Sequence, residues 1–218
     1  MTGGIAKIMS NDELMNIPIE ECGEPLVNIA EHTDRVVFEI EEISRKEQDV
    51  DEGTCMLRLF AAQMLGIAGS ELPKGYKFKV VDGYRPMSAQ RKLYSEVFGQ
   101  LKSKHPEMDD AAVADETDRW VANPKVVPPH TTGGAVDLTV IEENGIELDI
   151  GTPINTVSPK AKTMCDGLSK EQQANRYLLI ATMINAGFVN NPREWWHWSY
   201  GDRRWASVNG THAVYGPI

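Results

Sequence analysis

One stretch of this chain places an imidazole close to a carboxylate that the sequence pattern buries. His130 is followed, seven residues on, by Asp137, which lies inside the apolar run 135–141. On a straight strand this offset would put the two side chains on opposite faces, but Gly133 and Gly134 allow the chain to fold back. Buried carboxylates are normally paired or bound to a metal. Asp137 is therefore either the ion-pair partner of an arginine or a metal ligand beside His130.

A second stretch combines a carboxylate and an imidazole with tryptophans. Glu194 and His197 are three residues apart, among Trp195, Trp196 and Trp198. A hydrogen-bonded histidine beside a surface glutamate is the structural alternative. Taken with the first stretch, His197 completes a set of two His and one Asp, and three such ligands with one open position are typical of catalytic zinc sites. Glu194 could then take a proton from the attacking water and deliver it to the leaving amine.

Arg85 is a third candidate. It lies in Gly83-Tyr84-Arg85-Pro86, between a predicted strand and a predicted helix. A cation at this point could stabilise the oxyanion that forms when water attacks an amide. The alternative is a structural ion pair, which would contribute little if it were exposed.

The composition and charge of the chain argue against several classes of binding partner. The chain has 22 Lys and Arg against 32 Asp and Glu, a formal charge of −10, which argues against nucleic acid and against anionic membranes as partners. No apolar run approaches the roughly 20 residues of a membrane-spanning helix, and the first ten residues do not resemble a signal peptide. The cysteines, Cys22, Cys55 and Cys165, lack paired spacing. We expect reduced, buried thiols and a cytoplasmic protein.

The pattern of elements predicts an α+β fold. At roughly 150 residues per domain, we expect a single domain over residues 1–218. The predicted strands are 34–43, 76–81, 135–141, 146–150 and 195–200. The predicted helices are 54–65, the acidic stretch 106–122, and one that runs from a Ser169–Gln172 capping box to Ala186. A further helix is predicted to be capped by Ser88 and to have an inward face at Ala89, Leu93, Val97 and Leu101. Residues 123–132 are predicted as a loop, and Asn144-Gly145 as a hairpin turn that makes the sheet small and antiparallel.

These stretches, in this order, resemble the zinc D-alanyl-D-alanine dipeptidases of the VanX type, a branch of the zinc D,D-peptidases. The resemblance rests on residues 83–86, 130–139 and 194–197, and it extends to 149–153 and 200–206. It implies a Hedgehog/D,D-peptidase-like fold in which helices flank the sheet and zinc lies in a central cleft.

The resemblance also implies a role for each candidate residue. One Zn²⁺ per chain would be held by His130, Asp137 and His197. Glu194 would act as general base and then general acid, and Arg85 would stabilise the oxyanion. The implied reaction is hydrolysis of the free dipeptide D-Ala-D-Ala, a small D,D-peptide from peptidoglycan metabolism, in the cytoplasm. No oligomeric state follows from the sequence.

The chain departs from the family pattern at two places. Pro128 and Pro129 replace small polar residues before the metal-binding His. Asn155 stands where the family has an Asp associated with the substrate ammonium, and a neutral amide binds an ammonium less strongly than a carboxylate does. Asp149 is nearby and could substitute. Asn155 motivates a second hypothesis, a D,D-carboxypeptidase or a peptidase acting on longer peptidoglycan peptides. A third is a zinc-stabilised binding module without turnover, by analogy of fold.

Overall fold

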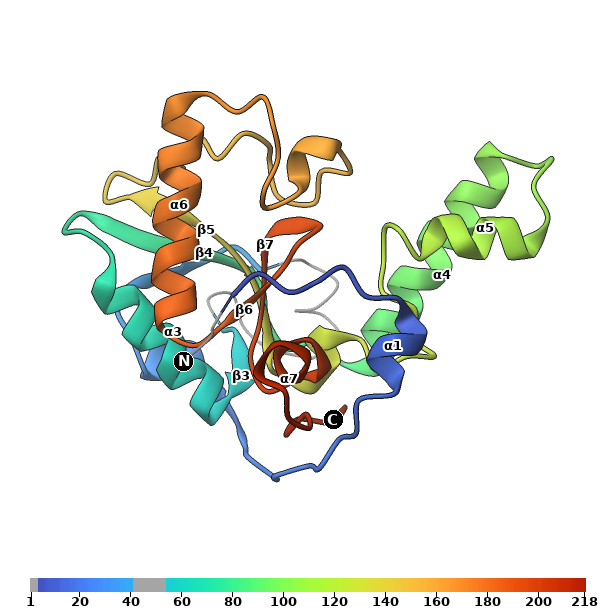
Figure 1. Cartoon of the computed structure of the whole chain (residues 1–218), viewed down its shortest axis with the longest axis horizontal. Helices are drawn as coiled ribbons and strands as arrows, with labels where there is room; N and C mark the ends of the chain where they lie inside the picture. Colours follow the sequence, from blue (N-terminus) through green and yellow to red (C-terminus); the bar gives the residue numbers. More distant parts are fainter. Residues whose placement is uncertain (1–3, 41–53) are drawn as a thin grey trace.

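The computed structural model describes residues 4–40 and 54–218, which form a mixed sheet flanked by helices (Figure 1). The helices of these residues are α1 (Asn11–Met15), α3 (Leu59–Glu71), α4 (Met87–Lys104), α5 (Asp110–Thr117), α6 (Lys170–Asn185) and α7 (Arg203–Asn209), with short 3₁₀ turns η1 (Ile29–Glu31), η2 (Pro129–Thr132) and η3 (Pro159–Ala161). α3 and α6 pack against each other, whereas α4 and α5 form an arm that projects from the body (Figure 1). The predicted α+β class is confirmed.

The main sheet has five strands in the order β2-β4-β5-β7-β6. Their bounds are β2 (Val36–Phe38), β4 (Tyr76–Asp82), β5 (Ala135–Glu142), β6 (Val189–Asn191) and β7 (Glu194–Ser199). All neighbours are antiparallel except β2, which runs parallel to β4 at one edge. A separate antiparallel pair joins β1 (Leu26–Asn28) to β3 (Met56–Arg58). The predicted small antiparallel sheet is therefore correct apart from its β2 edge.

β5 lies at the centre of the sheet, and all of its residues except Glu142 are buried. Phe78 and Leu138 of the sheet meet Leu65 of α3 and Leu179 and Met183 of α6 in the core, and none of these five side chains is exposed. Full burial of side chains of this size stabilises the fold by about 1.5–3 kcal/mol each. The strand that carries Asp137 is thus held by β4 and β7 at its two edges and by this core through Leu138.

The helix predicted over residues 54–65 is wrong in its first half. Residues 56–58 form β3, and α3 begins only at Leu59. Leu57 pairs with Val27 in β1, and the carbonyl of Met56 accepts a hydrogen bond from Tyr84 N (2.8 Å). These partners are distant in sequence, and their pairing overrides the local helical spacing.

The predicted cap of α4 is also wrong. The helix begins at Met87 with Pro86 as its N-cap residue, so Ser88 lies inside the first turn. Pro86 already has the extended backbone of a helix-flanking residue, and its carbonyl accepts from Gln90 N (3.0 Å). The predicted inward face is only partly buried, because it packs against α5 in the projecting arm and not against the sheet.

Several elements are shorter in the structure than the sequence predicts. The acidic helix covers only α5, the loop 123–132 ends in η2, and the turn at Gly145 is followed by the single bridge Ile141↔Glu147 and not by a strand over 146–150. Of the strand predicted at 34–43, only β2 forms, and 41–43 lie outside the described residues.

Other predictions are confirmed. β4, β5 and β7 match the predicted strands within a residue, and Ser169 and Gln172 form the predicted capping box of α6. The cysteines carry free thiols, but Cys22 is exposed, contrary to expectation, while Cys55 is buried. Among the described residues no helix combines the length and apolarity needed to cross a membrane.

Candidate metal centre

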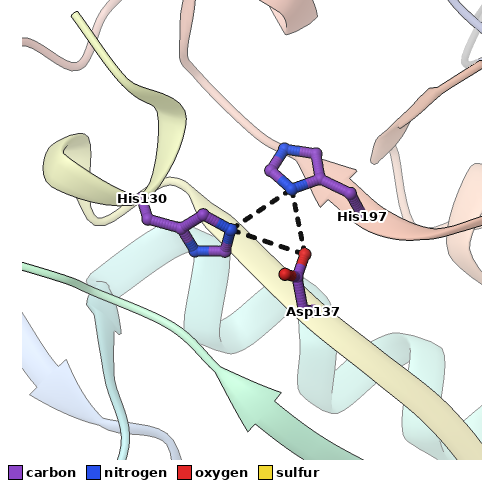
Figure 2. Close-up of side chains that lie close together, drawn as sticks. All are labelled: His130, Asp137 and His197. Carbon is purple, nitrogen blue, oxygen red and sulfur yellow. Dashed lines mark hydrogen bonds and ion pairs between the residues drawn. The ribbon is translucent and has the colours of Figure 1, made fainter. Parts of the chain in front are cut away.

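The structure brings together three side chains from three different elements. His130 projects from η2, Asp137 from β5 and His197 from β7, and they point toward one another (Figure 2). Asp137 and His197 are direct register partners across the β5–β7 ladder. The sheet register therefore places the carboxylate beside one imidazole, and the turn before β5 brings the other.

The facing atoms form a nearly equilateral triangle. His197 Nδ1 lies 2.9 Å from Asp137 Oδ1 and 3.2 Å from His130 Nε2. His130 Nε2 is 3.4 Å from Asp137 Oδ1. Ligands bound tetrahedrally to zinc at about 2.0–2.1 Å are separated by about 3.3 Å. The donor set and its spacing therefore fit three ligands on one face of a tetrahedral zinc ion.

A backbone contact orients His130 for this role. Its Nδ1 donates to the carbonyl oxygen of Gly83 at 2.8 Å. With the proton on Nδ1, the lone pair of Nε2 faces the triangle, and such contacts commonly fix the tautomer of metal-binding histidines. Ser199 Oγ lies near the other nitrogen of His197, 3.5 Å from Nε2.

The triangle is buried and strongly charged. His130 and Asp137 are each 7% exposed, and His197 is 4% exposed. Burial lowers the pKa of His130, but the nearby carboxylates of Asp137 and Asp82 outweigh it and raise the pKa to about 9. Burial raises the pKa of Asp137, whereas the two imidazoles offset this and hold that pKa well below its usual range. The metal-free cluster thus retains a proton, which indicates a site built to bind positive charge.

The glycines before β5 permit the chain reversal that the sequence suggested. Gly133 has a left-handed φ of 70°, and a Cβ there would lie 2.6 Å from Leu26 Cδ2. A Cβ on Gly134 would overlap the backbone oxygen of Tyr200. Only glycine fits this close approach, so His130 can turn back over Asp137.

Arg85 lies beside the triangle and contacts the side chains of Asp82 and Gln90. Its Nη2 contacts Asp82 Oδ2, and its Nη1 donates to Gln90 Oε1 at 3.0 Å. Arg85 N also donates to the carbonyl of His130 (3.1 Å). Among residues 4–40 and 54–218, no ion pair joins Asp137 to an arginine: Arg85 pairs with Asp82, and Asp137 pairs with two histidines.

Glu194 begins β7, three residues before His197, and is partly buried. Its Oε2 accepts a hydrogen bond from Asn191 Nδ2 at 2.7 Å. The preceding Asn190 donates to the backbone carbonyls of Glu194, Trp195 and His197, at a register shift in the β6–β7 ladder. No hydrogen bond or ion pair in the described part of the chain links Glu194 to the triangle.

Sequence reasoning missed the residues that support these side chains. Asp82 is unexposed, pairs in register with Asp137, and lies 3.7 Å from His130 Nδ1 through its Oδ2. Gln90 accepts a hydrogen bond from Arg85 and donates one to the backbone carbonyl of Ala122 (2.8 Å). It therefore links Arg85 to the segment that leads into η2. The available signal for such supporting residues was a polar residue close to a motif. Asp82 directly precedes Gly83, and Asn191 lies three residues before Glu194.

The resemblance to the dipeptidases aligns Asn155 with the position associated with the substrate ammonium. Asn155 adopts a left-handed backbone with φ of 61°. The suggested substitute, Asp149, is already engaged: its Oδ1 accepts from Gly151 N (2.9 Å) and its Oδ2 from Gln172 Nε2 (3.0 Å). Asp149 therefore fastens this loop to α6, and this structure does not support it as a receptor for a substrate ammonium.

Comparisons with known proteins identify the family of this chain. The sequence profile of the M15 peptidases, described as D-Ala-D-Ala dipeptidase, matches residues 41–215. A D-alanyl-D-alanine dipeptidase of Synechocystis sp. is 28% identical over 217 residues, which cover 87% of this chain and 87% of that protein. The D-alanyl-D-alanine dipeptidase of Escherichia coli is 29% identical over 123 residues, or 56% of this chain and 54% of that protein.

Among solved structures, a vancomycin-resistance D,D-pentapeptidase, VanY, in complex with Zn(II) overlaps 75% of this chain and 84% of its own. The TM-score is 0.44 and the sequence identity 17%. A likeness of this size carries no argument about function, which rests on the family match and on the site itself.

Proposed function

This chain belongs to the M15 peptidase family of D-Ala-D-Ala dipeptidases, and we propose that His130, Asp137 and His197 form the zinc centre with which it hydrolyses D-Ala-D-Ala. The chain is a zinc metallopeptidase by family. The observation that carries the assignment of the ligands is the buried triangle of two nitrogens and one oxygen, 2.9–3.4 Å apart.

Zinc bound at this triangle would polarise the peptide carbonyl and lower the pKa of the attacking water. The two histidines supply neutral nitrogen ligands, and Asp137 supplies one negative charge. Three protein ligands leave one position for water or substrate, which is the arrangement of catalytic and not structural zinc sites.

We assign proton transfer to Glu194. Its carboxylate would take the proton from the attacking water and give it to the leaving amine of the second D-alanine. The hydrogen bond from Asn191 to Oε2 leaves Oε1 to receive that proton. Partial burial of Glu194 strengthens its electrostatic interactions, because water screens them less.

We assign stabilisation of the oxyanion to Arg85. Negative charge develops on the carbonyl oxygen as the water attacks, and a fixed cation lowers the energy of that state. Asp82 and Gln90 hold the guanidinium in place before substrate arrives, so little reorganisation accompanies the reaction. Asp82 also interacts electrostatically with His130 and thereby couples the two parts of the site.

The preferred substrate is the free dipeptide, with longer D,D-peptides as the alternative that Asn155 favours. The test is D-alanine release by zinc-loaded protein from D-Ala-D-Ala and from its N-acetylated form, in parallel. Faster cleavage of the free dipeptide supports the dipeptidase. Equal or faster cleavage of the acetylated form would make the protein a carboxypeptidase, and zinc binding without cleavage of either would leave only a binding module.

The remaining proposals concern the whole chain. We propose that residues 1–218 act as one domain, because the family profile covers residues 41–215 in one block. A cytoplasmic location is consistent with the free cysteines. A net charge of −10 favours a small peptide partner over nucleic acid or an anionic membrane.

A further inference from the structure

The strand that carries Glu194 and His197 is irregular between them. The two residues are three positions apart in β7, and a regular strand would turn their side chains to opposite faces of the sheet. The pairing with β6 passes from Asn191↔Glu194 directly to Asn190↔Trp198, which is one step along β6 but four along β7. The intervening residues of β7 therefore form a bulge, a feature that re-aims side chains next to active sites.

The side chain of Asn190 spans this bulge. Asn190 is fully buried, and its Nδ2 lies 3.3 Å from the carbonyl oxygens of Glu194 and Trp195 and 3.0 Å from that of His197. Carbonyl oxygens only accept hydrogen bonds, so the amide nitrogen and not Oδ1 must face them. One side-chain amide thus replaces the ladder bonds that the bulge interrupts, and it does so at the backbone of both functional residues.

Thr163 fixes the orientation of this amide. Its Oγ1 donates to Asn190 Oδ1 and lies 3.1 Å from the backbone oxygen of Asn191. Thr163 is 1% exposed, and its own backbone oxygen accepts a hydrogen bond from Arg176 Nη1 of α6 (3.2 Å). The backbone oxygen of Asn190 in turn accepts from Ala6 N (3.2 Å). The backbone and the side chain of Asn190 are therefore both held by segments outside β7.

We propose that Asn190 is a positioning residue, oriented by Thr163, that holds β7 in the bulged shape with which Glu194 acts beside the metal centre. The inference rests on the proposed function, in which Glu194 transfers the proton. His197 has a second support, because it pairs in register with Asp137, and this pair is the last of the β5–β7 ladder in the described residues. Glu194 lies beyond the end of that ladder. Loss of the Asn190 contacts should therefore displace Glu194 more than His197.

The test compares variants that differ by one polar group. Thr163→Val removes the hydroxyl and keeps the shape, whereas Thr163→Ser keeps the hydroxyl. We expect Thr163→Val to lower kcat for D-Ala-D-Ala about tenfold with KM and zinc content unchanged, and Thr163→Ser to recover most of the loss. Asn190→Asp, which replaces the donor with an acceptor, should lower kcat about 100-fold. Thr182→Val is the matched control, because Thr182 is 4% exposed and its hydroxyl donates to Leu178 O within α6.

A double-mutant cycle determines whether the effect passes through Glu194. In the Glu194→Gln background, Thr163→Val should have little further effect on the residual kcat, because residues that act through one another are not additive. The full tenfold loss in that background would overturn the proposal. So would unchanged kcat in both Thr163→Val and Asn190→Asp, or a loss of zinc that matches the loss of kcat.

Hydrogen exchange in the zinc-free protein gives a readout that does not depend on the reaction. The backbone amides of β7 should exchange faster in Thr163→Val and Asn190→Asp than in the unmodified protein, and Thr182→Val should leave them unchanged. Failure of the proposed function would appear as no hydrolysis of D-Ala-D-Ala by the unmodified, zinc-loaded protein. Failure of the present proposal would appear as unchanged exchange in Thr163→Val and Asn190→Asp, so the two failures are distinguishable.

Discussion

The metal triangle and the two groups beside it are held in different ways. His130, Asp137 and His197 contact one another directly, and two of them are register partners in adjacent strands. Arg85 and Glu194 are instead held by residues outside the triangle. Arg85 contacts Asp82 and Gln90, and Glu194 accepts a hydrogen bond from Asn191. The triangle therefore depends on the sheet, whereas the groups assigned to proton transfer and charge stabilisation depend on polar neighbours. Substitutions within the triangle should therefore weaken metal binding, whereas substitutions of Arg85 or Glu194 should lower turnover and leave the metal bound.

The largest effect is expected within the triangle. Asp137→Asn removes the negative ligand and leaves an amide that also disturbs two buried imidazoles. Zinc affinity should fall by more than about 100-fold, the upper range for partners of metal ligands that do not themselves touch the metal, and activity should fall to background. Metal analysis after dialysis against buffered zinc measures this. Full zinc occupancy in the variant would show that Asp137 is not a ligand; Glu143→Gln, in an exposed turn, is the control.

Glu194→Gln should leave the metal in place and stop the chemistry. Loss of a general acid–base group costs roughly 10²–10⁴-fold in rate, and the amide remains able to bond with Asn191. Steady-state kinetics with parallel zinc analysis gives the comparison. If the verified variant is active, Glu194 is not the proton-transfer group. Metal binding and turnover would then not depend on separate groups of residues.

Arg85→Met should lower kcat by roughly 10²–10³-fold, the usual effect of losing one donor to an oxyanion. This variant also removes the Arg85–Asp82 ion pair from a buried carboxylate, so Gln90→Leu offers a milder probe that keeps the pair. We expect Gln90→Leu to lower kcat about tenfold with unchanged zinc content. Equal zinc loss in both variants would mean that this pair serves the metal site and not the reaction.

Asn191→Leu should reduce kcat by about 10–100-fold with little change in KM, because the carboxylate of Glu194 loses the bond that orients it. Asn191→Gln, which retains an amide, should recover part of the loss. A fall in melting temperature in Asn191→Leu, with no recovery of kcat in Asn191→Gln, would point to a structural role alone.

The smallest predicted effect is on stability. Without metal, the His130 pKa is raised from 6.5 to about 9, so its contribution to folding is complete below pH 6.5 and is lost as the pH rises through 9. Zinc requires the neutral imidazole, so its stabilisation grows over the same range. The difference in melting temperature between zinc-loaded and zinc-free protein should therefore widen by a few degrees from pH 6.5 to 9. A constant difference would contradict the proton–metal exchange at His130.

Residue types and spacing were enough to single out the candidate site, but not its supports. His130, Asp137 and His197 stand out because a carboxylate or imidazole inside an apolar run demands a partner, and the structure brings all three together. The supporting roles of Asp82 and Asn191 could not be assigned from their positions near the motifs alone, because their contacts depend on strand register and on a bulge.

The same cause explains where the fold prediction failed. Residues 56–58 pair with β1, a segment about thirty residues earlier in the chain, and no local pattern records that pairing. Features with strong local signals, such as the capping box at Ser169 and the turn at Gly145, were predicted correctly, whereas the strand predicted at 146–150 after that turn is reduced to one bridge. Non-local contacts decided the rest.

The most direct test of the central claim is a zinc titration of metal-free protein, with D-alanine release from D-Ala-D-Ala as the readout. The His130–Asp137–His197 centre predicts no activity without metal, a linear rise in activity up to one equivalent of zinc per chain, and no rise in Asp137→Asn. Activity in fully metal-free protein, or one tightly bound zinc per chain with no release of D-alanine, would contradict it.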